Sequence, residues 1–410
     1  VHRLYFSHSA TVGAWETEVG LVNLASATVQ GVLRAYDHKG NAVSNEVAVS
    51  LPPRGRRQVT VGSTFSNPDS IGYLVYRSAS SDVTGYMNFY MAGTCRTSVP
   101  AVRESEVNTG NIAIPHIASD DTWWMGISLL NTTSASKTVT FDFGGGLRKT
   151  KTVGPRAHDA FFLWDLFGGS GSRPPNLQSA LITNAAGIIG YSLFANDDTL
   201  AGTVLEDESA YGLYFPHIAV TKDWETCLVV QNLSSSSGTL TITSYDGNGT
   251  TLGSQNRSIP AWGKYLAVSS TALPSGTAWC RVSADRPLAG SCFAVFRGTK
   301  FAAFTVTAKE GKSLIFPRLE KSGYTGIAFV NPGSGSASVT LKAYNDSGRV
   351  VATKYLTVGA CAKKVDIADN FFDSSISGAS WIGLTANRNI VGFQLNHTSD
   401  LKFLDALEGL

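Results

Sequence analysis

The sequence LYFPHIAVTKDWETCLVVQN, residues 213–232, occurs in four related versions along the chain. The other versions are LYFSHSATVGAWETEVGLVN at 4–23, IAIPHIASDDTWWMGISLLN at 112–131 and LIFPRLEKSGYTGIAFVN at 314–331. Their closing residues, Asn23, Asn131, Asn232 and Asn331, are 108, 101 and 99 residues apart. This period is the length of a whole small domain, whereas solenoid and propeller repeats run roughly 20–50 residues. The chain is therefore predicted to contain four copies of one domain.

Strand signals dominate each copy. Segments such as GTLTITSYD (238–246) and SVTLKAYN (338–345) alternate polar and apolar residues, which is the pattern of a half-buried strand. Gly, Pro, Asn, Asp and Ser interrupt the runs every ~8–12 residues, a spacing typical of a β-sandwich. The predicted fold is all-β, with four tandem Ig-like β-sandwich repeats at 1–107, 108–210, 211–310 and 311–410.

The composition narrows the classes of partner. Charged residues make up 16% of the chain, below the ~25% of average domains, while 43% of residues are hydrophobic, as in a folded protein. The net charge of +2 gives no basic field for nucleic acid. No apolar run approaches the ~18–20 residues of a spanning helix. We therefore expect neither a nucleic-acid partner nor a membrane span in this chain.

The first strand of each copy, followed by Trp-x-Thr and a closing Asn, carries a resemblance. In four tandem copies, this pattern resembles repeat regions of uncharacterised bacterial secreted or cell-surface proteins. The residues that carry the resemblance are Phe215, Pro216, His217, Ile218, Ala219, Trp224, Thr226 and Asn232. The resemblance implies an extracytoplasmic β-sandwich array (secreted, periplasmic or on the cell surface), and it implies no activity.

One position of the repeat holds His8, His116, His217 and, in the fourth copy, Arg318. If the copies close into a ring rather than form a string, these side chains face one another. Three histidines with an open position form a catalytic zinc arrangement. The alternative is that each histidine bonds the backbone of its own copy, and Arg318 favours this because arginine donates well to carbonyls. We predict no cofactor, with zinc at the three histidines as the alternative.

A second repeated position is aromatic. Trp15, Trp123 and Trp224 share it, and Tyr324 lies one residue out of register in the fourth copy. Exposed rings would offer stacking platforms for the apolar face of a sugar. Buried rings would fill the sandwich core, as a strand tryptophan usually does. The core interpretation is favoured, and sugar binding at these four residues is the alternative.

Cys280 and Cys292 lie on either side of the segment SADRPLAG (283–290), which is predicted to form a hairpin. Opposed Cβ atoms in an antiparallel pair lie about 4.5–5.5 Å apart, slightly wider than the ~3.5–4.5 Å of a disulfide. The sequence is therefore compatible with either a disulfide between these two cysteines or a pair of buried thiols. The cysteine spacing does not match a zinc finger.

The closing asparagines are expected to be structural, because an Asn before a turn can bond the backbone two residues on. Glu16 and Glu225 also share a position, but they lie in separate copies and do not suggest a pair of catalytic carboxylates. The sequence contains no GxSxG, HExxH, P-loop or dinucleotide-binding motif.

The leading hypothesis is a non-enzymatic secreted or surface-exposed repeat protein that presents a binding or adhesive surface to a protein or glycan. One alternative is a metal-binding protein or enzyme with a composite site where the repeats meet. The other is an array of carbohydrate-binding modules.

Overall fold

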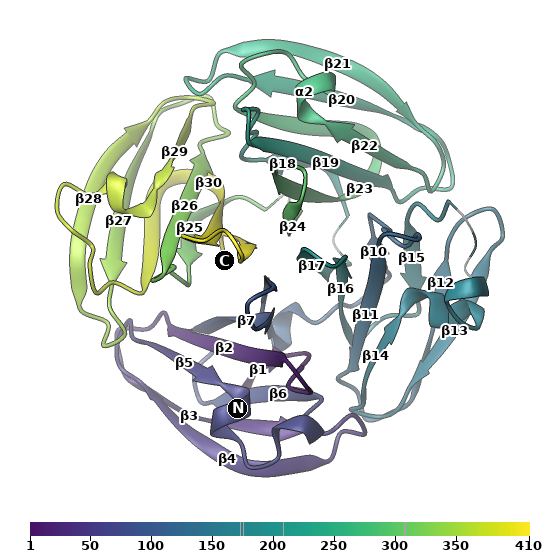
Figure 1. The fold of residues 1–410 in the computed structure, drawn as a ribbon. Coiled ribbons are helices and arrows are strands. Elements are labelled where there is room, and N and C mark those ends of the chain that lie inside the picture. The colour runs from purple at the N-terminus through teal and green to yellow at the C-terminus, as the bar shows by residue number, and fades with distance from the viewer. Residues whose placement is uncertain (173, 175, 208, 307–308) are drawn as a thin grey trace. The chain divides into compact units, whose positions relative to one another are not determined.

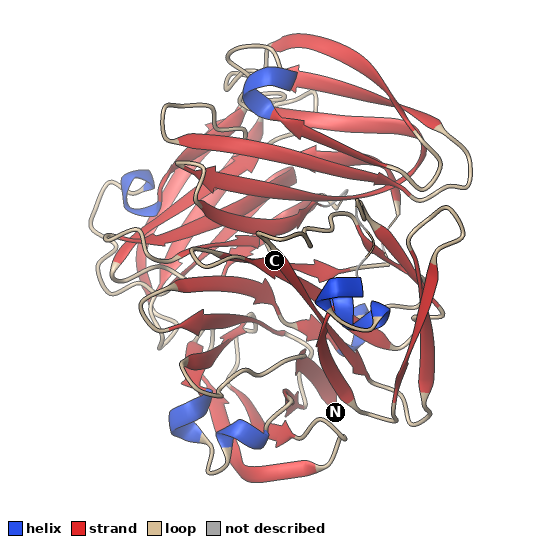
Figure 2. Cartoon of the chain, turned by 45° about the vertical axis from the view of Figure 1, so that its right-hand side comes forward, coloured by secondary structure: helices blue, strands red, loops and turns tan. Residues whose placement is uncertain are grey.

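A computed structural model describes residues 1–172, 174, 176–207, 209–306 and 309–410. Regular structure is almost entirely antiparallel strand, and the helices are single turns between strands (Figure 2). This confirms the predicted all-β class. The chain divides into two compact units, Val1–Glu208 and Ser209–Leu410, and each unit contains two of the predicted repeats. Within the described ranges, no helix is both long enough and apolar enough to cross a membrane.

The first repeat is a sandwich of two sheets. One sheet has the order β4 (Ala42–Leu51), β3 (Val29–Tyr36), β6 (Tyr73–Ser78), β1 (His2–Phe6) and β9 (Val102–Arg103). The other has the order β5 (Arg56–Thr60), β2 (Trp15–Asn23), β7 (Val83–Met91) and β8 (Cys95–Pro100). The helical turns are α1 (Val61–Thr64), η1 (Pro68–Ser70) and η2 (Glu104–Glu106).

The second repeat has the same arrangement. Its first sheet has the order β10 (Ile112–Ile114), β15 (Ala180–Thr183), β12 (Lys137–Asp142) and β13 (Arg148–Val153). Its second sheet has the order β14 (His158–Phe162), β11 (Trp124–Asn131), β16 (Ile188–Ala195) and β17 (Leu200–Leu205). The helical turns are η3 (Leu163–Phe167) and η4 (Ser170–Ser172).

In the third and fourth repeats one long strand pairs with two groups of strands and joins them in a single seven-stranded sheet. In the third, β23 (Trp279–Phe296) pairs first with β18 (Ala210–Phe215) and β20 (Gly238–Tyr245), and then with β19 (Trp224–Asn232) and β24 (Lys300–Val306). The edges are β21 (Thr251–Ile259) and β22 (Lys264–Val268), which is followed by α2 (Ser269–Ala272).

The fourth repeat is built in the same way around β30 (Trp381–Thr398). Its other elements are β25 (Gly311–Phe316), β26 (Gly323–Val330), β27 (Ala337–Tyr344), β28 (Val350–Val358), β29 (Lys363–Ile367), η5 (Ala368–Phe371) and β31 (Leu404–Glu408). Figure 1 shows β27 and β28 in one layer and β26 and β29 in the other. Along β27 every second side chain is buried, which is the alternation that the sequence predicts.

The hairpin predicted around residues 283–290 is therefore wrong. Cys280 and Cys292 lie on the same strand, β23, at points where it pairs with different strands. Both thiols are buried in one core cluster, and neither is in a disulfide. Residues 283–290 connect the two parts of β23, so their Pro and Gly lie within a continuous strand and not at a reversal.

The closing asparagine of each repeat fixes the turn after its strand. Asn131 is fully buried; its Nδ2 donates to the carbonyls of Ala135, Val153 and Gly154, and its Oδ1 accepts from the backbone N of Thr133. Asn23, Asn232 and Asn331 make the matching bonds. The predicted structural role of these asparagines is confirmed.

The two sandwiches within each unit share apolar contacts. Tyr191, Ala195 and Leu200 of the second repeat belong to the core cluster of the first. In unit 2, Ala328 and Phe393 of the fourth repeat join the core cluster of the third. Each unit therefore has an internal junction between two repeats, and the candidate sites lie at these junctions.

Candidate functional site

In unit 2 the junction brings together His217 and Lys363. His217 follows β18, while Lys363 is the first residue of β29, and its backbone N donates to Gly247 O at 3.0 Å. Lys363 Nζ lies 2.8 Å from His217 Nδ1 and donates to Ala278 O at 2.7 Å. An amine group from the fourth repeat is thus held by two acceptors of the third.

Burial governs the charge of this pair. The Lys363 side chain is almost inaccessible, and burial lowers the pKa of its amine to about 7. Burial, and secondarily the charge of Lys363, lowers the pKa of His217 to about 3. Because the lysine nitrogen donates, His217 Nδ1 accepts and its proton is on Nε2. Near pH 7 a large share of Lys363 is a neutral amine beside a neutral imidazole.

A pocket of about 590 Å³ opens beside this pair. Its apolar lining includes the side chains of Leu273, Ala294, Phe304, Phe393 and Leu395. Its polar lining includes Lys363, His217, Thr226 and Ser269. The volume lies within the roughly 300–1,000 Å³ of small-molecule sites, which are mostly apolar with a few placed polar groups.

Unit 1 contains the counterpart of this junction. His8 has the place of His217, and His158, the first residue of β14, has the place of Lys363. The backbone N of His158 donates to His38 O at 3.0 Å, just as that of Lys363 donates to Gly247 O. The two junctions are therefore versions of one arrangement.

The side chains in unit 1 form a chain of imidazoles. His158 Nε2 lies 3.1 Å from His8 Nδ1 and 3.0 Å from Ser128 Oγ, while His158 Nδ1 lies 2.9 Å from His38 Nδ1. Burial and the neighbouring His38 lower the pKa of His8 to about 3, and burial beside both other histidines holds the pKa of His158 well below its usual value. His38 is exposed, so the chain runs from solvent to the interior.

This chain differs from the predicted metal site. The nitrogens of His158 point to different partners, so the three rings follow one another instead of surrounding one point. In the part of the chain that the structure describes, no group of three or more His, Cys, Asp or Glu side chains is arranged to hold a metal ion. His116, the remaining histidine of the predicted set, is half-buried with its ring 5.7 Å from that of Phe194.

The main difference between the two junctions is one aromatic ring. Strand pairing places Gly85 opposite Leu21 and Gly290 opposite Val230, so Phe89 corresponds to Ala294. Phe89 is buried, with its ring stacked 5.7 Å from Tyr191 and edge-on to His8 at 5.2 Å. Unit 1 thus holds a phenyl ring where Ala294 of unit 2 borders a pocket.

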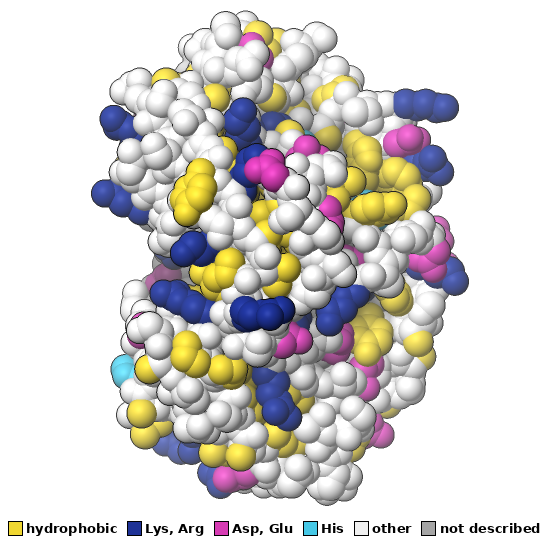
Figure 3. Space-filling model, turned by 90° about the vertical axis from the view of Figure 1, so that its left-hand side faces the viewer, with side chains coloured by type: hydrophobic (Ala, Val, Ile, Leu, Met, Phe, Trp, Pro, Cys, Tyr) yellow, Lys and Arg dark blue, Asp and Glu magenta, His cyan; other side chains and the backbone are white. Residues whose placement is uncertain are grey.

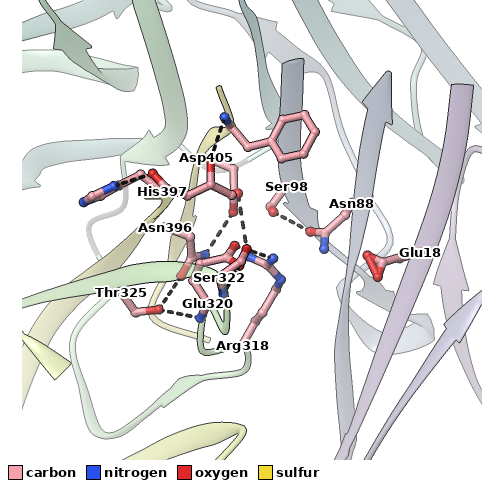
Figure 4. A network of polar contacts seen from close by, with 12 residues as sticks. Glu18, Asn88, Ser98, Arg318, Glu320, Ser322, Thr325, Asn396, His397 and Asp405 are labelled. Atoms are coloured by element: carbon pink, nitrogen blue, oxygen red, sulfur yellow. Dashed lines mark hydrogen bonds and ion pairs between the residues drawn. The ribbon is translucent and has the colours of Figure 1, made fainter. Parts of the chain in front are cut away.

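Arg318, which occupies the histidine position in the fourth repeat, has a structural setting. Its Nη2 donates to Glu320 Oε2 at 2.7 Å, and its Nη1 lies 3.7 Å from Asp405 Oδ2 (Figure 4). Asn396 donates to Asp405 Oδ1 at 2.9 Å and accepts from Thr325 Oγ1 at 2.8 Å. These side chains are buried, so the charge of Arg318 is compensated inside its own repeat.

The four residues at the predicted aromatic position differ in burial. Trp15 and Trp224 are half-buried and pack against core clusters, and Trp224 also lines the pocket beside Lys363. Trp123 is half-buried near Phe194, while Tyr324 is 47% exposed beside His397. The four rings thus range from core packing to solvent, and sugar stacking at this position stays a prediction.

Sequence reasoning found His8 and His217 but missed their partners. A turn that contains Pro or Gly, here called the corner, lies at 52–55, 154–157, 260–263 and 359–362. In every repeat a basic residue begins the strand after this corner: Arg56, His158, Lys264 and Lys363. This signal is visible in the sequence, but the residue type changes from copy to copy. It would have been found by aligning the corners and comparing charge instead of identity.

Comparisons with known proteins add no identification. No protein-family model matches the chain, and no curated protein matches it. Among solved structures, it is similar to a glycoside hydrolase of family 32 from Bifidobacterium adolescentis, with 8% sequence identity and a TM-score of 0.15. That alignment covers 100% of this chain and 96% of the other. A TM-score this low supports no conclusion about fold or activity.

Proposed function

We propose that this chain is a non-enzymatic binding protein whose unit 2 takes a small, largely apolar molecule bearing one hydrogen-bond acceptor. The observation that carries the proposal is the pocket of about 590 Å³ whose mostly apolar lining includes Lys363. Apolar walls supply affinity through burial of ligand surface, and a single polar group in such a site fixes orientation.

The acceptor is the specific part of this proposal. Lys363 donates to His217 and Ala278, and its ammonium form has a third N–H for a ligand carbonyl, hydroxyl or carboxylate oxygen. In the part of the chain that the structure describes, no carboxylate forms an ion pair with Lys363. A hydrogen-bond acceptor on the ligand therefore does not compete with a carboxylate of these residues for the amine of Lys363.

We also propose that the protein is extracytoplasmic, as the sequence resemblance implies, and that it contacts its partner without a strong electrostatic field. Figure 3 shows charged side chains of both signs scattered among uncharged ones over the face in view. The net charge of +2 agrees with a neutral or weakly charged ligand or partner.

The test is calorimetric titration with 2-naphthylmethanol, an unreactive aromatic alcohol of suitable size. The natural sequence should bind about one equivalent, and Ala294→Phe should weaken binding at least tenfold, because the ring would occupy the pocket as Phe89 occupies unit 1. The exposed neighbour Lys364 supplies the control, since Lys364→Met should bind normally. Equal binding by all three proteins would contradict the proposal.

A second candidate function is glycan binding by the second repeat. Loops there border a more open and more polar pocket of about 740 Å³, lined by Trp123, Trp124, Trp164, Asp121 and Asp198, among others. Aromatic faces beside carboxylates are suited to the apolar and hydroxyl faces of a sugar. Titration with a panel of neutral oligosaccharides should quench tryptophan fluorescence, and Trp164→Ala should remove the response. No response to any sugar would contradict this candidate.

A further inference from the structure

The proposed ligand of unit 2 can be defined further by the chemistry of the amine beside it. We infer that Lys363 forms a covalent imine with an aldehyde or ketone bound in the pocket that it shares with His217. This inference rests on the proposed binding function and names its substrate class. It follows from the hydrogen bonds of the lysine, the position of its nitrogen and the arrangement of the apolar walls.

The hydrogen bonds hold the amine in a reactive orientation. A neutral amine has two N–H bonds and one lone pair. His217 Nδ1 at 2.8 Å and Ala278 O at 2.7 Å provide one acceptor for each N–H. The lone pair is then the remaining direction at Nζ, and Lys363 borders the pocket. The inference requires that a carbonyl carbon bound in the pocket reach this lone pair.

The amine is also available in its reactive protonation state. Desolvation in an apolar site is one of the established ways of activating a lysine as a nucleophile. A pKa of about 7 leaves about half of Lys363 neutral at pH 7, whereas an unperturbed lysine near 10.4 is neutral in only roughly one molecule in 10³. The nearby imidazole of His217 is neutral as well and does not repel the cation formed later.

The reaction balances without a redox partner or metal. The lone pair of Lys363 Nζ attacks the carbonyl carbon, and the carbonyl oxygen takes up a proton to give a carbinolamine. The C–O bond then breaks, and the oxygen leaves as water with the two hydrogens that were originally on nitrogen. The product is a C=N bond. If it is protonated, its single N–H can still donate to His217 Nδ1 or Ala278 O.

Unit 1 provides the internal contrast. Its corresponding residue is His158, which has no primary amine, and the neighbouring space holds the ring of Phe89. Of the two junctions, only that of unit 2 is therefore expected to form an imine. The exposed Lys364, which follows Lys363 on the same strand, shares its sequence neighbourhood but not its burial.

The experiment uses the full chain with 2-naphthaldehyde and sodium cyanoborohydride at pH 7, followed by peptide mass mapping. Reduction converts the imine to a stable secondary amine. Lys363 should be labelled at least tenfold faster than Lys364. Lys363→Met should lose the adduct at this site, and Ala294→Phe should lose it although the amine is still present.

Binding of 2-naphthylmethanol, measured on the same proteins, separates the two proposals. Lys363→Met loses the donor to the alcohol oxygen and should bind the alcohol more weakly, while a circular-dichroism spectrum like that of the natural protein would show that the variant folds. If the natural protein binds the alcohol but labels Lys363 no faster than Lys364, imine formation is refuted and the binding function stands. If the alcohol does not bind and Lys363 is not labelled, both proposals fail. Rapid labelling that Ala294→Phe does not reduce would also overturn the inference, because it would occur outside the pocket.

Discussion

The junctions of unit 1 and unit 2 have the same arrangement of strands but differ in their side chains. In unit 1, His8, His158 and His38 form a hydrogen-bonded chain covered by the ring of Phe89. In unit 2, His217 and Lys363 form a single pair beside a pocket. One scaffold thus supports a packed polar chain in one unit and an open site in the other.

This difference shows which positions of the repeat are committed to folding and which are available for function. The closing asparagine makes the same bonds in all four repeats and is fully buried. The residue after the corner varies among Arg, His and Lys, and the ring of Phe89 is replaced by Ala294. Sites arise where a framework repeated in each copy carries side chains that differ between copies.

The largest expected effect comes from removing the ring that fills unit 1. Phe89→Ala should destabilise that unit by about 3–5 kcal/mol, because a buried phenyl group is lost and a cavity is left. Hydrogen exchange followed by mass spectrometry would show faster exchange in β7 and β16, with unit 2 unchanged. Bound 2-naphthylmethanol in unit 1 of this variant would show that the ring alone distinguishes the junctions. A loss below about 1 kcal/mol would contradict the packing comparison.

The shared framework should respond equally in both units. Asn131→Ala and Asn331→Ala each remove a fully buried amide that serves several backbone groups, and each should cost about 2–4 kcal/mol. Denaturant unfolding with local exchange readout would measure both. Replacement by Asp is the matched control, because it keeps the acceptor but loses the donors. A large cost in only one unit would show that this position is not equivalent in the two.

The pH dependence of stability should separate the units on the alkaline side. The folded pKa of Lys363 is about 7, below the unfolded value near 10.5, so between these values the unfolded state binds more protons. Unit 2 should therefore gain up to about 1.4 kcal/mol per pH unit as the pH rises from 7 to 8, below the range in which its buried thiols Cys227, Cys280 and Cys292, whose pKa values are raised, act in the opposite sense. Lys363 faces the neutral His217 and Ala278 O, and Lys363→Met should remove most of this gain, leaving the part that comes from Lys264, whose buried amine has a pKa of about 8. An unchanged gain in that variant would assign it to another group.

On the acidic side, both units should lose stability. The pKa values of His8 and His217 are about 3, below the unfolded value near 6.5. Stability should fall as the pH drops from about 6.5 towards 3, because the unfolded state binds more protons in this range. Unit 1 should lose more, since His158 beside His8 and His38 also has a lowered pKa. Equal losses of stability in both units would contradict the prediction that His158 adds a second buried imidazole with a lowered pKa to unit 1.

The sequence predicted the repeat and its fold because these depend on local patterns. Each copy repeats the alternation of apolar residues, the corner and the turn-forming asparagine. These features determine the structure of residues close to them in the sequence. The strand β23 was misread because Pro287 and Gly290 suggest a reversal. In the structure they lie where the strand changes its pairing partners from β20 to β19, which depends on segments far away in the sequence.

Only part of each candidate site could be predicted, because the rest depends on contacts between segments that are far apart in the sequence. The repeated position identified His8 and His217. Their partners belong to the next repeat and lie more than 140 residues away in the sequence. No local pattern reports such a contact. The pocket depends on Ala294, and an alanine in a strand does not reveal whether a neighbouring ring covers it. Comparing the repeats position by position would have shown the contrast with Phe89, though not its geometry.

The smallest effect concerns a feature that the units share outside the junction. Glu16 Oε1 accepts from the backbone N of Gly62 at 2.9 Å, and Glu225 Oε1 accepts from that of Ser270 at 3.0 Å. Each carboxylate satisfies a donor at the start of α1 or α2. Replacement by Ala should cost about 1 kcal/mol in either unit, as for other side chains that bond the first turn of a helix, whereas Gln keeps an acceptor oxygen.

This pair also tests how far the binding site extends. Ser269, which lines the pocket, donates to Glu225 Oε1, while the matching residue beside Glu16 is Val61. If α2 belongs only to the shared framework, Glu225→Ala should lower stability as Glu16→Ala does and change the affinity for 2-naphthylmethanol less than about twofold. A tenfold change, equal to about 1.4 kcal/mol, would instead place Ser269 and the start of α2 among the groups that hold the ligand.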